Sequence, residues 1–262
     1  MIRRCLLPLA ALLALAACAT GPGPARMTLA ATDTPQWDWQ LQDPKLRPRS
    51  DVMDLDPDEV TRRQVRRLGA QGTTTIAYVS VGTRERWRGD RDAFPASVVG
   101  RAYDGWAGER FLDIRKVERL RPIMRARFER AARMGFDAIE PDNMDVHVND
   151  SGFAVRPRHT VRYMRAMAGE AQALGLEIGQ KNAPELVPRL VDTLDFMVTE
   201  DCFADGWCRK TLPYIRAGKP VYAAEYTDTG VNMRRACRFA ARHGITMSQF
   251  DRDLSGPAIR QC

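Results

Sequence analysis

The chain has 262 residues, a formal net charge of +7, 44% hydrophobic residues and 28% charged residues. This apolar fraction excludes a mostly disordered chain, and the length suits one barrel-sized domain. The three histidines, His147, His159 and His243, have no metal-binding spacing, which argues against a histidine-built zinc site. The sequence also lacks a G-x-x-x-x-G-K-[ST] phosphate-binding loop and a G-x-S-x-G nucleophile motif. P-loop nucleotidases and serine α/β-hydrolases are therefore excluded.

The N-terminal segment has the pattern of an export signal. Two arginines precede an apolar run over residues 6–17, which is too short to span a bilayer comfortably. The run ends in Leu-Ala-Ala-Cys, which resembles the bacterial lipobox. We expect residues 1–17 to be a lipoprotein signal peptide and Cys18 to be lipidated. A plain secretory signal that ends beside a chance cysteine is the alternative.

The rest of the chain then divides into two parts. Residues 18–35 contain a Gly-Pro-Gly-Pro stretch, and we expect them to be a flexible tether; we expect residues 36–262 to be the domain. The expected product is an exported bacterial lipoprotein, at the outer membrane, at the cell surface or in the periplasm. Ala19 after the lipidated cysteine favours the outer membrane.

Four cysteines remain after processing, at positions 202, 208, 237 and 262. In an oxidising compartment an even set suggests two disulfides, and four cysteines allow three connectivities. The short spacing and the turn residues between them favour Cys202–Cys208, which leaves Cys237–Cys262.

The arginine-rich composition does not indicate a nucleic-acid partner. The arginines are spread through predicted helices, such as 57–70 and 117–134, and a solvated outer face accounts for them. We expect a monomer with no nucleic-acid partner.

Short apolar runs alternate with helical patterns along the domain. The predicted strands are 37–41, 51–56, 74–81, 136–141, 176–181, 196–200, 220–226 and 245–250. The predicted helices lie near 57–70, 117–134, 158–174, 184–193, 209–217 and 231–243.

This alternation predicts a parallel α/β sheet. Eight strands in about 225 residues fit a single (β/α)8 TIM-like barrel, with the first helix replaced by the proline-rich loop 43–50. A doubly wound open sheet is the alternative. The absence of a glycine-rich turn after the early strands argues against it.

Polar residues gather where the predicted strands end. They are Asp54, Asp56, Tyr78, Ser80, Glu140, Asp142, Asn143, Lys181, Asn182, Glu200, Asp201, Glu225, Tyr226, Gln249 and Asp251. In a parallel barrel all these ends meet at one face, where active sites are built. Because side chains alternate along a strand, Glu140, Glu200 and Glu225 each follow a small or apolar residue on the same face.

Several carboxylates without a catalytic histidine suit glycoside hydrolysis, which needs an acid for the leaving oxygen and a carboxylate at the anomeric carbon. Aromatic side chains for stacking on sugar rings are also available. They are Trp37, Trp39, Trp87, Trp106 and Tyr226.

A series of ordered motifs makes the indication specific. They are 37–41 (WDWQL), 51–56 (DVMDLD), 77–82 (AYVSVG), 94–97 (FPAS), 108–115 (GERFLDIR), 135–143 (GFDAIEPDN), 149–152 (NDSG), 181–182 (KN), 200–202 (EDC) and 251–254 (DRDL). Over 36–262 the chain resembles glycoside hydrolase family 114, the endo-α-1,4-polygalactosaminidase-like barrels. The motif at 200–202 departs from the family's common Glu-Gln-Cys.

The resemblance implies a retaining hydrolase whose catalytic pair is Asp142 and Glu200. Asp142 would be the nucleophile, kept ionised by Lys181 or Asn143, and Glu200 the acid and then the base. Glu200 would hold its proton through burial or through nearby Asp201 or Glu225. Retention requires the two carboxyl groups to lie about 5–5.5 Å apart.

The implied substrate is a galactosamine-containing polysaccharide, whose cationic units an acidic cleft would attract. Neutral α-linked polysaccharides stay an alternative. The expected substrate-binding residues are Trp37, Asp54, Tyr78, Ser80, Asp113, Glu140, Asn143, Asp145, Lys181, Asn182, Glu225, Tyr226 and Asp251. We expect no cofactor and no metal.

Two other functions stay open. The barrel could be a catalytically silent polysaccharide-binding lipoprotein, although the presence of both Asp142 and Glu200 argues against this. It could also be a metal-dependent polysaccharide deacetylase. The stretch 142–149 looks like a metal loop, but the EF-hand glycine and terminal glutamate are not at the required positions.

Overall fold

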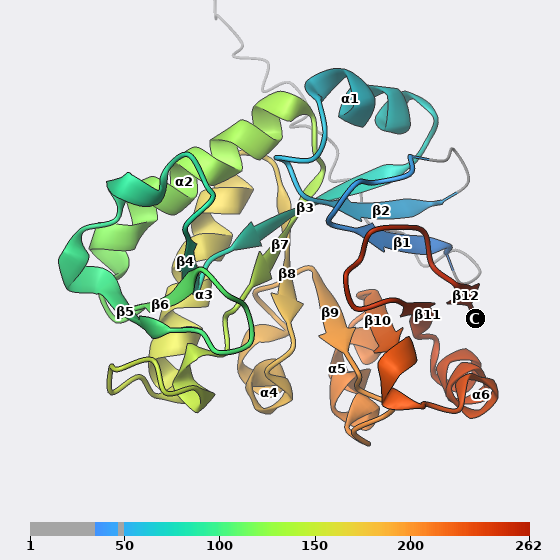
Figure 1. The fold of residues 1–262 in the computed structure, drawn as a ribbon. Helices are drawn as coiled ribbons and strands as arrows, with labels where there is room; N and C mark the ends of the chain where they lie inside the picture. The colour runs from blue at the N-terminus through green and yellow to red at the C-terminus, as the bar shows by residue number, and fades with distance from the viewer. Residues whose placement is uncertain (1–34, 47–49) are drawn as a thin grey trace, which may run out of the picture.

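The computed structural model describes residues 35–46 and 50–262. Eight parallel strands in sequence order form a nearly closed barrel (Figure 1). They are β1 (Trp37–Gln40), β2 (Val52–Leu55), β3 (Thr74–Ser80), β7 (Ala138–Asp142), β8 (Glu177–Lys181), β9 (Phe196–Glu200), β10 (Val221–Tyr226) and β11 (Thr246–Phe250). The Ser248 hydroxyl donates to the Trp37 carbonyl oxygen at 3.2 Å and links the last of these strands to the first. The predicted barrel is confirmed, and the open-sheet alternative is wrong.

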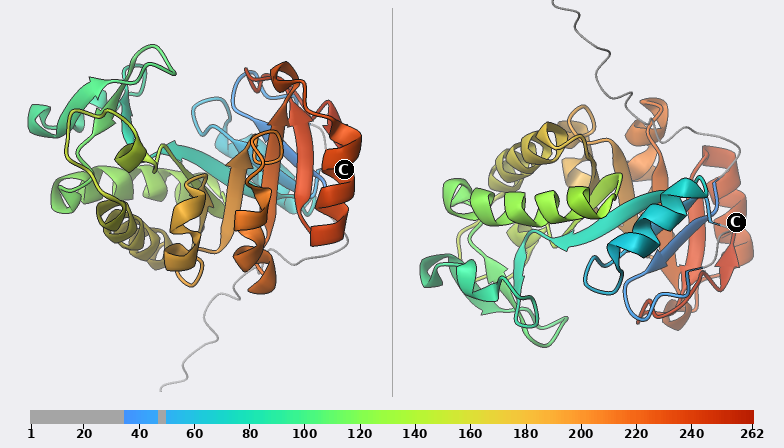
Figure 2. Two further views of the ribbon diagram at one scale, coloured as in Figure 1. Left: turned by 90° about the horizontal axis from the view of Figure 1, so that it is seen from below. Right: turned by 90° about the horizontal axis from the view of Figure 1, so that it is seen from above.

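Helices cover the outside of the barrel (Figure 2). They are α1 (Arg62–Ala70), α2 (Val117–Met134), α3 (Pro157–Ala173), α4 (Val187–Leu190), α5 (Leu212–Arg216) and α6 (Met233–His243). Short 3₁₀ helices accompany them: η1 (Arg91–Ala93), η2 (Ala96–Val98), η3 (Val146–Val148), η4 (Pro184–Leu186), η5 (Cys208–Thr211) and η6 (Thr227–Thr229). Helix α1 begins later than predicted because Thr61 caps it, in a reciprocal capping box with Gln64. The described part of the β1–β2 connection contains no helix, as predicted.

Two layers of apolar side chains hold the barrel together. One cluster fills the interior and includes Trp37, Ile76, Phe196 and Tyr222, and a larger cluster lies between the strands and the helices. Strand β8 has a glycine in the interior, Gly179, because a Cβ there would lie 2.5 Å from the Phe196 ring. Close packing of large rings at the bottom of the barrel thus leaves the open end for polar groups.

The connection between β3 and α2 carries a three-stranded antiparallel sheet that the sequence analysis did not predict. Its strands are β4 (Thr83–Glu85), β5 (Val99–Ala102) and β6 (Glu109–Leu112). We call residues 82–116 the β3–α2 insert; it stands beyond one end of the barrel (Figure 2). The insert leaves the barrel at Gly82, where a Cβ would lie 1.6 Å from the Asn143 carbonyl oxygen. This position therefore requires glycine.

The C-terminal tail returns to the barrel. Strand β12 (Arg260–Gln261) pairs antiparallel with β11. Both predicted disulfides are present, Cys202–Cys208 and Cys237–Cys262, and the second ties the tail to α6. Across the described ranges no helix is long and apolar enough to cross a membrane. The predicted signal peptide, Cys18 and nearly all of the tether lie outside the described residues.

Candidate active site

A cavity of about 730 Å³ opens where the parallel strands end. Its wall includes the ends of β3, β7, β8, β9 and β10 and several side chains of the β3–α2 insert. The predicted site residues on this wall are Tyr78, Asp142, Asn143, Asp145, Lys181, Asn182, Glu200 and Tyr226. These polar residues therefore gather at one face of the barrel, as expected for the ends of parallel strands.

Lys181 lies at the centre of this site. Its Nζ lies 2.9 Å from Asp142 Oδ1, 2.9 Å from Glu140 Oε1 and 3.2 Å from Glu200 Oε2. The nearest oxygens of Asp142 and Glu200 are thus no farther apart than about 6 Å, the sum of their two distances to Nζ. Burial alone would lower the pKa of Lys181, but the three carboxylates raise it well above its usual range. A permanent cation therefore holds the two predicted catalytic carboxylates together.

Donors surround the Asp142 carboxylate. Tyr78 Oη donates to Oδ2 at 2.9 Å, Asn143 Nδ2 donates to Oδ2 at 3.1 Å, and Lys181 donates to Oδ1. Burial on its own would raise the pKa of Asp142, but Lys181 and Tyr78 hold this pKa below its usual range. Asp142 is therefore ionised at neutral pH, as a carboxylate nucleophile must be.

Glu200 is placed by groups from the two neighbouring strands. Tyr226 Oη donates to Oε1 at 2.6 Å, and Asn182 Nδ2 donates to Oε2 at 2.9 Å. Asn182 Oδ1 also accepts the Glu200 backbone N–H at 2.9 Å, so one amide fixes both the strand end and its side chain. The Glu200 side chain is 30% exposed, so its carboxyl group is accessible from the cavity.

A second acidic pair lies below the cavity, inside the barrel. Glu140 Oε2 accepts the Trp39 indole N–H at 3.0 Å. Burial and the adjacent Glu140 charge raise the pKa of Asp54 well above its usual range. Burial also raises the pKa of Glu140, although the charge of Lys181 opposes this shift, and a proton on Asp54 can hydrogen-bond to Glu140. This arrangement leaves one lysine to neutralise the carboxylates above and below it.

Comparison with known proteins identifies the chain. The sequence model of glycoside-hydrolase family GH114 matches residues 20–262. The chain belongs to family GH114. It is a glycoside hydrolase with the barrel fold of that family.

Solved structures agree with the family assignment. Aspergillus fumigatus Ega3, in a complex with galactosamine, has a TM-score of 0.83 and 25% sequence identity, covering 92% of this chain and 99% of that one. The glycoside hydrolase domain of PelA from Pseudomonas aeruginosa has a TM-score of 0.63 and 18% identity, covering 86% and 97%. Among curated protein sequences no significant match is found.

Seven predicted substrate-binding residues do not line the cavity of this GH114 enzyme. They are Trp37, Asp54, Ser80, Asp113, Glu140, Glu225 and Asp251. Glu140, Asp54 and Ser80 lie directly behind the wall, where Glu140 contacts Lys181 and Ser80 Oγ accepts from Asn143. Trp37 packs one layer lower, against Trp39. Asp113 is paired with Arg115, and Asp251 accepts from Thr227.

Glu225 faces away from the barrel interior. Tyr222, Ala224 and Tyr226 take the interior positions of β10, so strand alternation turns Glu225 outward. Its carboxylate accepts the backbone N–H groups of Phe203 and Ala204 at 2.7 and 3.0 Å. The prediction that Glu225 would lie at the mouth of the barrel is therefore wrong. It placed residues 223 and 225 on the interior face of β10, whereas the interior positions are 222, 224 and 226.

Asp201 also differs from its expected role as a neighbour that keeps Glu200 protonated. Its Oδ1 accepts the Tyr226 backbone N–H at 3.0 Å, and its Oδ2 lies 3.2 Å from Arg252. Arg252 in turn lies over the Tyr226 ring, 4.1 Å from its centroid. Asp201 thus positions Tyr226, which donates to Glu200.

The β3–α2 insert supplies cavity residues that the sequence analysis did not assign as substrate-binding. Glu109, Trp87, Tyr103 and Trp106 all lie on the wall. The two tryptophans are 45% and 44% exposed, unusual for side chains of this size. The sequence did contain indications of their role: both tryptophans were noted as residues that can stack on sugar rings, and Glu109 falls in the 108–115 motif.

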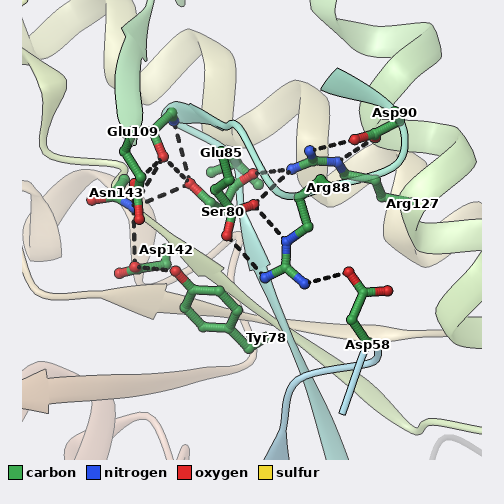
Figure 3. A network of polar contacts seen from close by, with 12 residues as sticks. Asp58, Tyr78, Ser80, Glu85, Arg88, Asp90, Glu109, Arg127, Asp142 and Asn143 are labelled. Atoms are coloured by element: carbon green, nitrogen blue, oxygen red, sulfur yellow. Dashed lines mark hydrogen bonds and ion pairs between the residues drawn. The ribbon is translucent and has the colours of Figure 1, made fainter. Parts of the chain in front are cut away.

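An ionic network fastens the insert to the barrel (Figure 3). Arg88 contacts Asp56 and Asp58 at 2.7 Å and Glu85 at 2.9 Å. Arg127, on α2, contacts Asp90 and donates to the Ser80 carbonyl oxygen. These links connect the first part of the insert, residues 85–90, to the segment after β2 and to helix α2, which in turn contacts the end of β3.

In residues 35–46 and 50–262, one cluster has the proximity that a metal site requires: Cys202, Cys208 and Glu225. Its two cysteines form a disulfide and offer no thiolate. The loop 142–149 also has other partners, since His147 contacts Glu185 and Thr160. These contacts do not favour the deacetylase alternative.

Stability should fall as the pH rises from 5 to 8. Burial raises the pKa of Glu109 and of Glu225 to about 7, against a usual value of 4.5. The folded state therefore holds protons that the unfolded state has released, so the added stability is complete below pH 4.5 and disappears through pH 7. We expect the Tm to drop by several degrees across this interval.

Glu109→Gln tests the origin of this slope, because a neutral amide cannot titrate. Its Tm should vary less with pH than that of the wild type, as measured by calorimetry at pH 5, 6, 7 and 8. Equal slopes for the variant and the wild type would show that Glu109 does not contribute.

Proposed function

We propose that the enzyme hydrolyses α-1,4-linked galactosamine-containing polysaccharide with retention of configuration, with Asp142 as nucleophile and Glu200 as acid and base. The observation that carries this proposal is the contact of both carboxylates with Lys181 Nζ at the bottom of the cavity. The nearest oxygens of the two carboxylates are at most about 6 Å apart. This limit fits the carboxyl spacing of about 5–5.5 Å in retaining enzymes better than the spacing of about 6.5–9.5 Å in inverting ones.

In the first step, Asp142 attacks the anomeric carbon while Glu200 gives its proton to the glycosidic oxygen. The C–O bond to the leaving sugar breaks, and a glycosyl ester forms on Asp142. Lys181, Tyr78 and Asn143 hold the nucleophile in place without protonating it.

In the second step, Glu200 removes a proton from water. The hydroxide attacks the same anomeric carbon, the ester bond breaks, and Asp142 leaves as a carboxylate. The contacts of Tyr226 and Asn182 keep Glu200 at the same position for both proton transfers.

The charge of the cavity supports a cationic substrate. Of the described residues on its wall, ten are acidic and three are basic. The chain as a whole carries a net charge of +7, so this surface is opposite in sign to the rest of the molecule. A polymer of amino sugars would be drawn to the cavity and repelled elsewhere. The complex of Ega3 with galactosamine is consistent with this substrate class.

Defined oligomers test the proposal. Purified enzyme is incubated with α-1,4-galactosamine oligomers of several lengths and with neutral α-1,4-linked oligomers, and the products are followed by mass spectrometry and proton NMR. We expect cleavage of the amino-sugar oligomers and an α-anomer as the first product. Cleavage of the neutral oligomers alone would contradict the substrate class, and a β-anomer as first product would contradict retention.

We also propose that the enzyme is anchored through lipid on Cys18, because the lipobox pattern ends at this cysteine. Cys18→Ala should release the protein from the membrane fraction while the oligomer-cleaving activity stays unchanged. Membrane attachment that survives the substitution would contradict the anchor.

A further inference from the structure

Each cation among the described residues of the cavity wall already contacts at least two carboxylates. Arg88 contacts three carboxylates, Lys181 contacts three, and Arg252 contacts Asp201 and Asp228. A carboxylate on the wall that lacks a cation must therefore obtain one from outside the protein or remain partly protonated.

Glu109 is such a carboxylate. It lies on the wall, is only 5% exposed, and forms no ion pair with the described residues. Its Oε2 accepts from Thr83 Oγ1 and, at 3.4 Å, from Asn143 Nδ2, while its Oε1 has no hydrogen-bond partner in the described part of the chain. Burial and the charges of Glu85 and Asp142 raise its pKa to about 7. A bound cation would offset both the cost of burying the Glu109 charge and its repulsion from Glu85 and Asp142.

The position of Glu109 relative to the nucleophile specifies which cation fits. Asn143 Nδ2 contacts both Glu109 Oε2 and Asp142 Oδ2, at 3.4 and 3.1 Å, so these oxygens are at most about 6.5 Å apart, the sum of the two distances (Figure 3). When Asp142 attacks the anomeric carbon, the nitrogen on the adjacent C2 of a 2-amino sugar lies within this range. An ammonium group there can lie between the two carboxylates.

We propose that Glu109 is a specificity-determining residue that binds the C2 ammonium group of the sugar attacked by Asp142. It thereby selects a 2-amino sugar over the N-acetylated form. The inference rests on the proposed function, since it assigns a subsite within the same cavity. An acetamide is uncharged and larger, so it would leave Glu109 without a cation and would need additional space.

The test compares Glu109→Gln with wild type on galactosamine oligomers and on their N-acetylated counterparts. Gln keeps an oxygen for Thr83 and Asn143 but removes the charge. We expect kcat/KM for the amino-sugar oligomers to fall about 10–100-fold, the scale of a charge-assisted hydrogen bond. For the N-acetylated oligomers kcat/KM should change less than about 3-fold, because an uncharged group does not use this contact.

Glu59→Gln is the matched control, because Glu59 is an exposed acid on the rim of the same cavity. The substitution removes one negative charge, and the amide oxygen of Gln can still accept the Asp43 backbone N–H that Glu59 accepts at 3.4 Å. We expect little change for either substrate. Glu109→Asp serves as a second variant that keeps the charge, and it should preserve the preference for the amino sugar.

Three outcomes would overturn the assignment. Equal losses on both substrates for Glu109→Gln would indicate a structural role. Equal effects of Glu59→Gln and Glu109→Gln would indicate a diffuse electrostatic effect. Loss of the preference for the amino sugar in Glu109→Asp would show that the negative charge at position 109 does not determine this preference. Wild-type enzyme that fails to cleave galactosamine oligomers would instead overturn the proposed function itself.

Discussion

Asp142→Asn should abolish turnover on every substrate, whatever its leaving group. An amide cannot form the glycosyl ester, and the loss should be on the order of 10⁴–10⁶-fold, the scale seen when a hydrolase loses its nucleophile. Lys181 would keep Glu140 and Glu200 as partners, so we expect the variant to fold. The measurement is the initial rate of reducing-end release from galactosamine oligomers and of fluoride release from the corresponding glycosyl fluoride.

Asp145→Asn provides the matched control. Asp145 lies on the wall of the same cavity, three residues after Asp142. Burial and the Asp142 charge raise the pKa of Asp145 above its usual value. We expect the control to lose less than about 10-fold, the scale of one ordinary hydrogen bond. If Asp142→Asn kept as much activity as Asp145→Asn, the assignment of the nucleophile would be wrong.

The barrel could be predicted from the sequence because its strands and helices alternate with clear ends. Helix α2 illustrates this: it ends at Met134, Gly135 caps it with a φ of 99° that favours glycine, and β7 begins three residues after Gly135. The meeting of polar groups at one face followed from parallel pairing alone, which needs no knowledge of individual contacts. The roles of Asp142 and Glu200 came from the family resemblance and stay predictions.

The β3–α2 insert could not be predicted in the same way. Its strands have three or four residues, and β5 and β6 carry the charged side chains Arg101, Glu109 and Arg110. Such segments show too little alternation of apolar and polar residues to indicate a sheet. Tertiary contacts hold the insert in place: Arg88 binds acids that lie about 30 residues away in the sequence.

Strand alternation also explains which site residues were placed wrongly. On β7 the predicted interior positions are correct, since Glu140 and Asp142 both contact Lys181. On β10 every residue is buried, and a continuous buried run does not reveal which face is interior. The large Tyr226 ring took the interior position, and Glu225 was left to bind backbone N–H groups outside.

Glu200→Ala should separate the two chemical steps. Without the acid, cleavage of the natural polymer should fall by about 10²–10⁴-fold, the usual contribution of general acid–base catalysis. A substrate with an activated leaving group, such as a galactosaminyl fluoride, needs no proton for the first step and should still form the ester on Asp142. Hydrolysis of that ester would then be slow, because Glu200 no longer activates water. A burst of fluoride followed by slow turnover is the expected signature.

Added azide should restore turnover in Glu200→Ala, because an anion needs no base. The Asp142 ester lies on one face of the sugar, so azide attacks from the other face and yields a glycosyl azide of retained configuration. The alanine leaves space near Tyr226 and Asn182, the two side chains that hold Glu200 in the wild type. Asp142→Ala serves as the comparison, since azide there would replace the nucleophile and give the inverted product. Rescue of Asp142→Ala with retention, or of Glu200→Ala with inversion, would mean that the two carboxylates have the opposite roles.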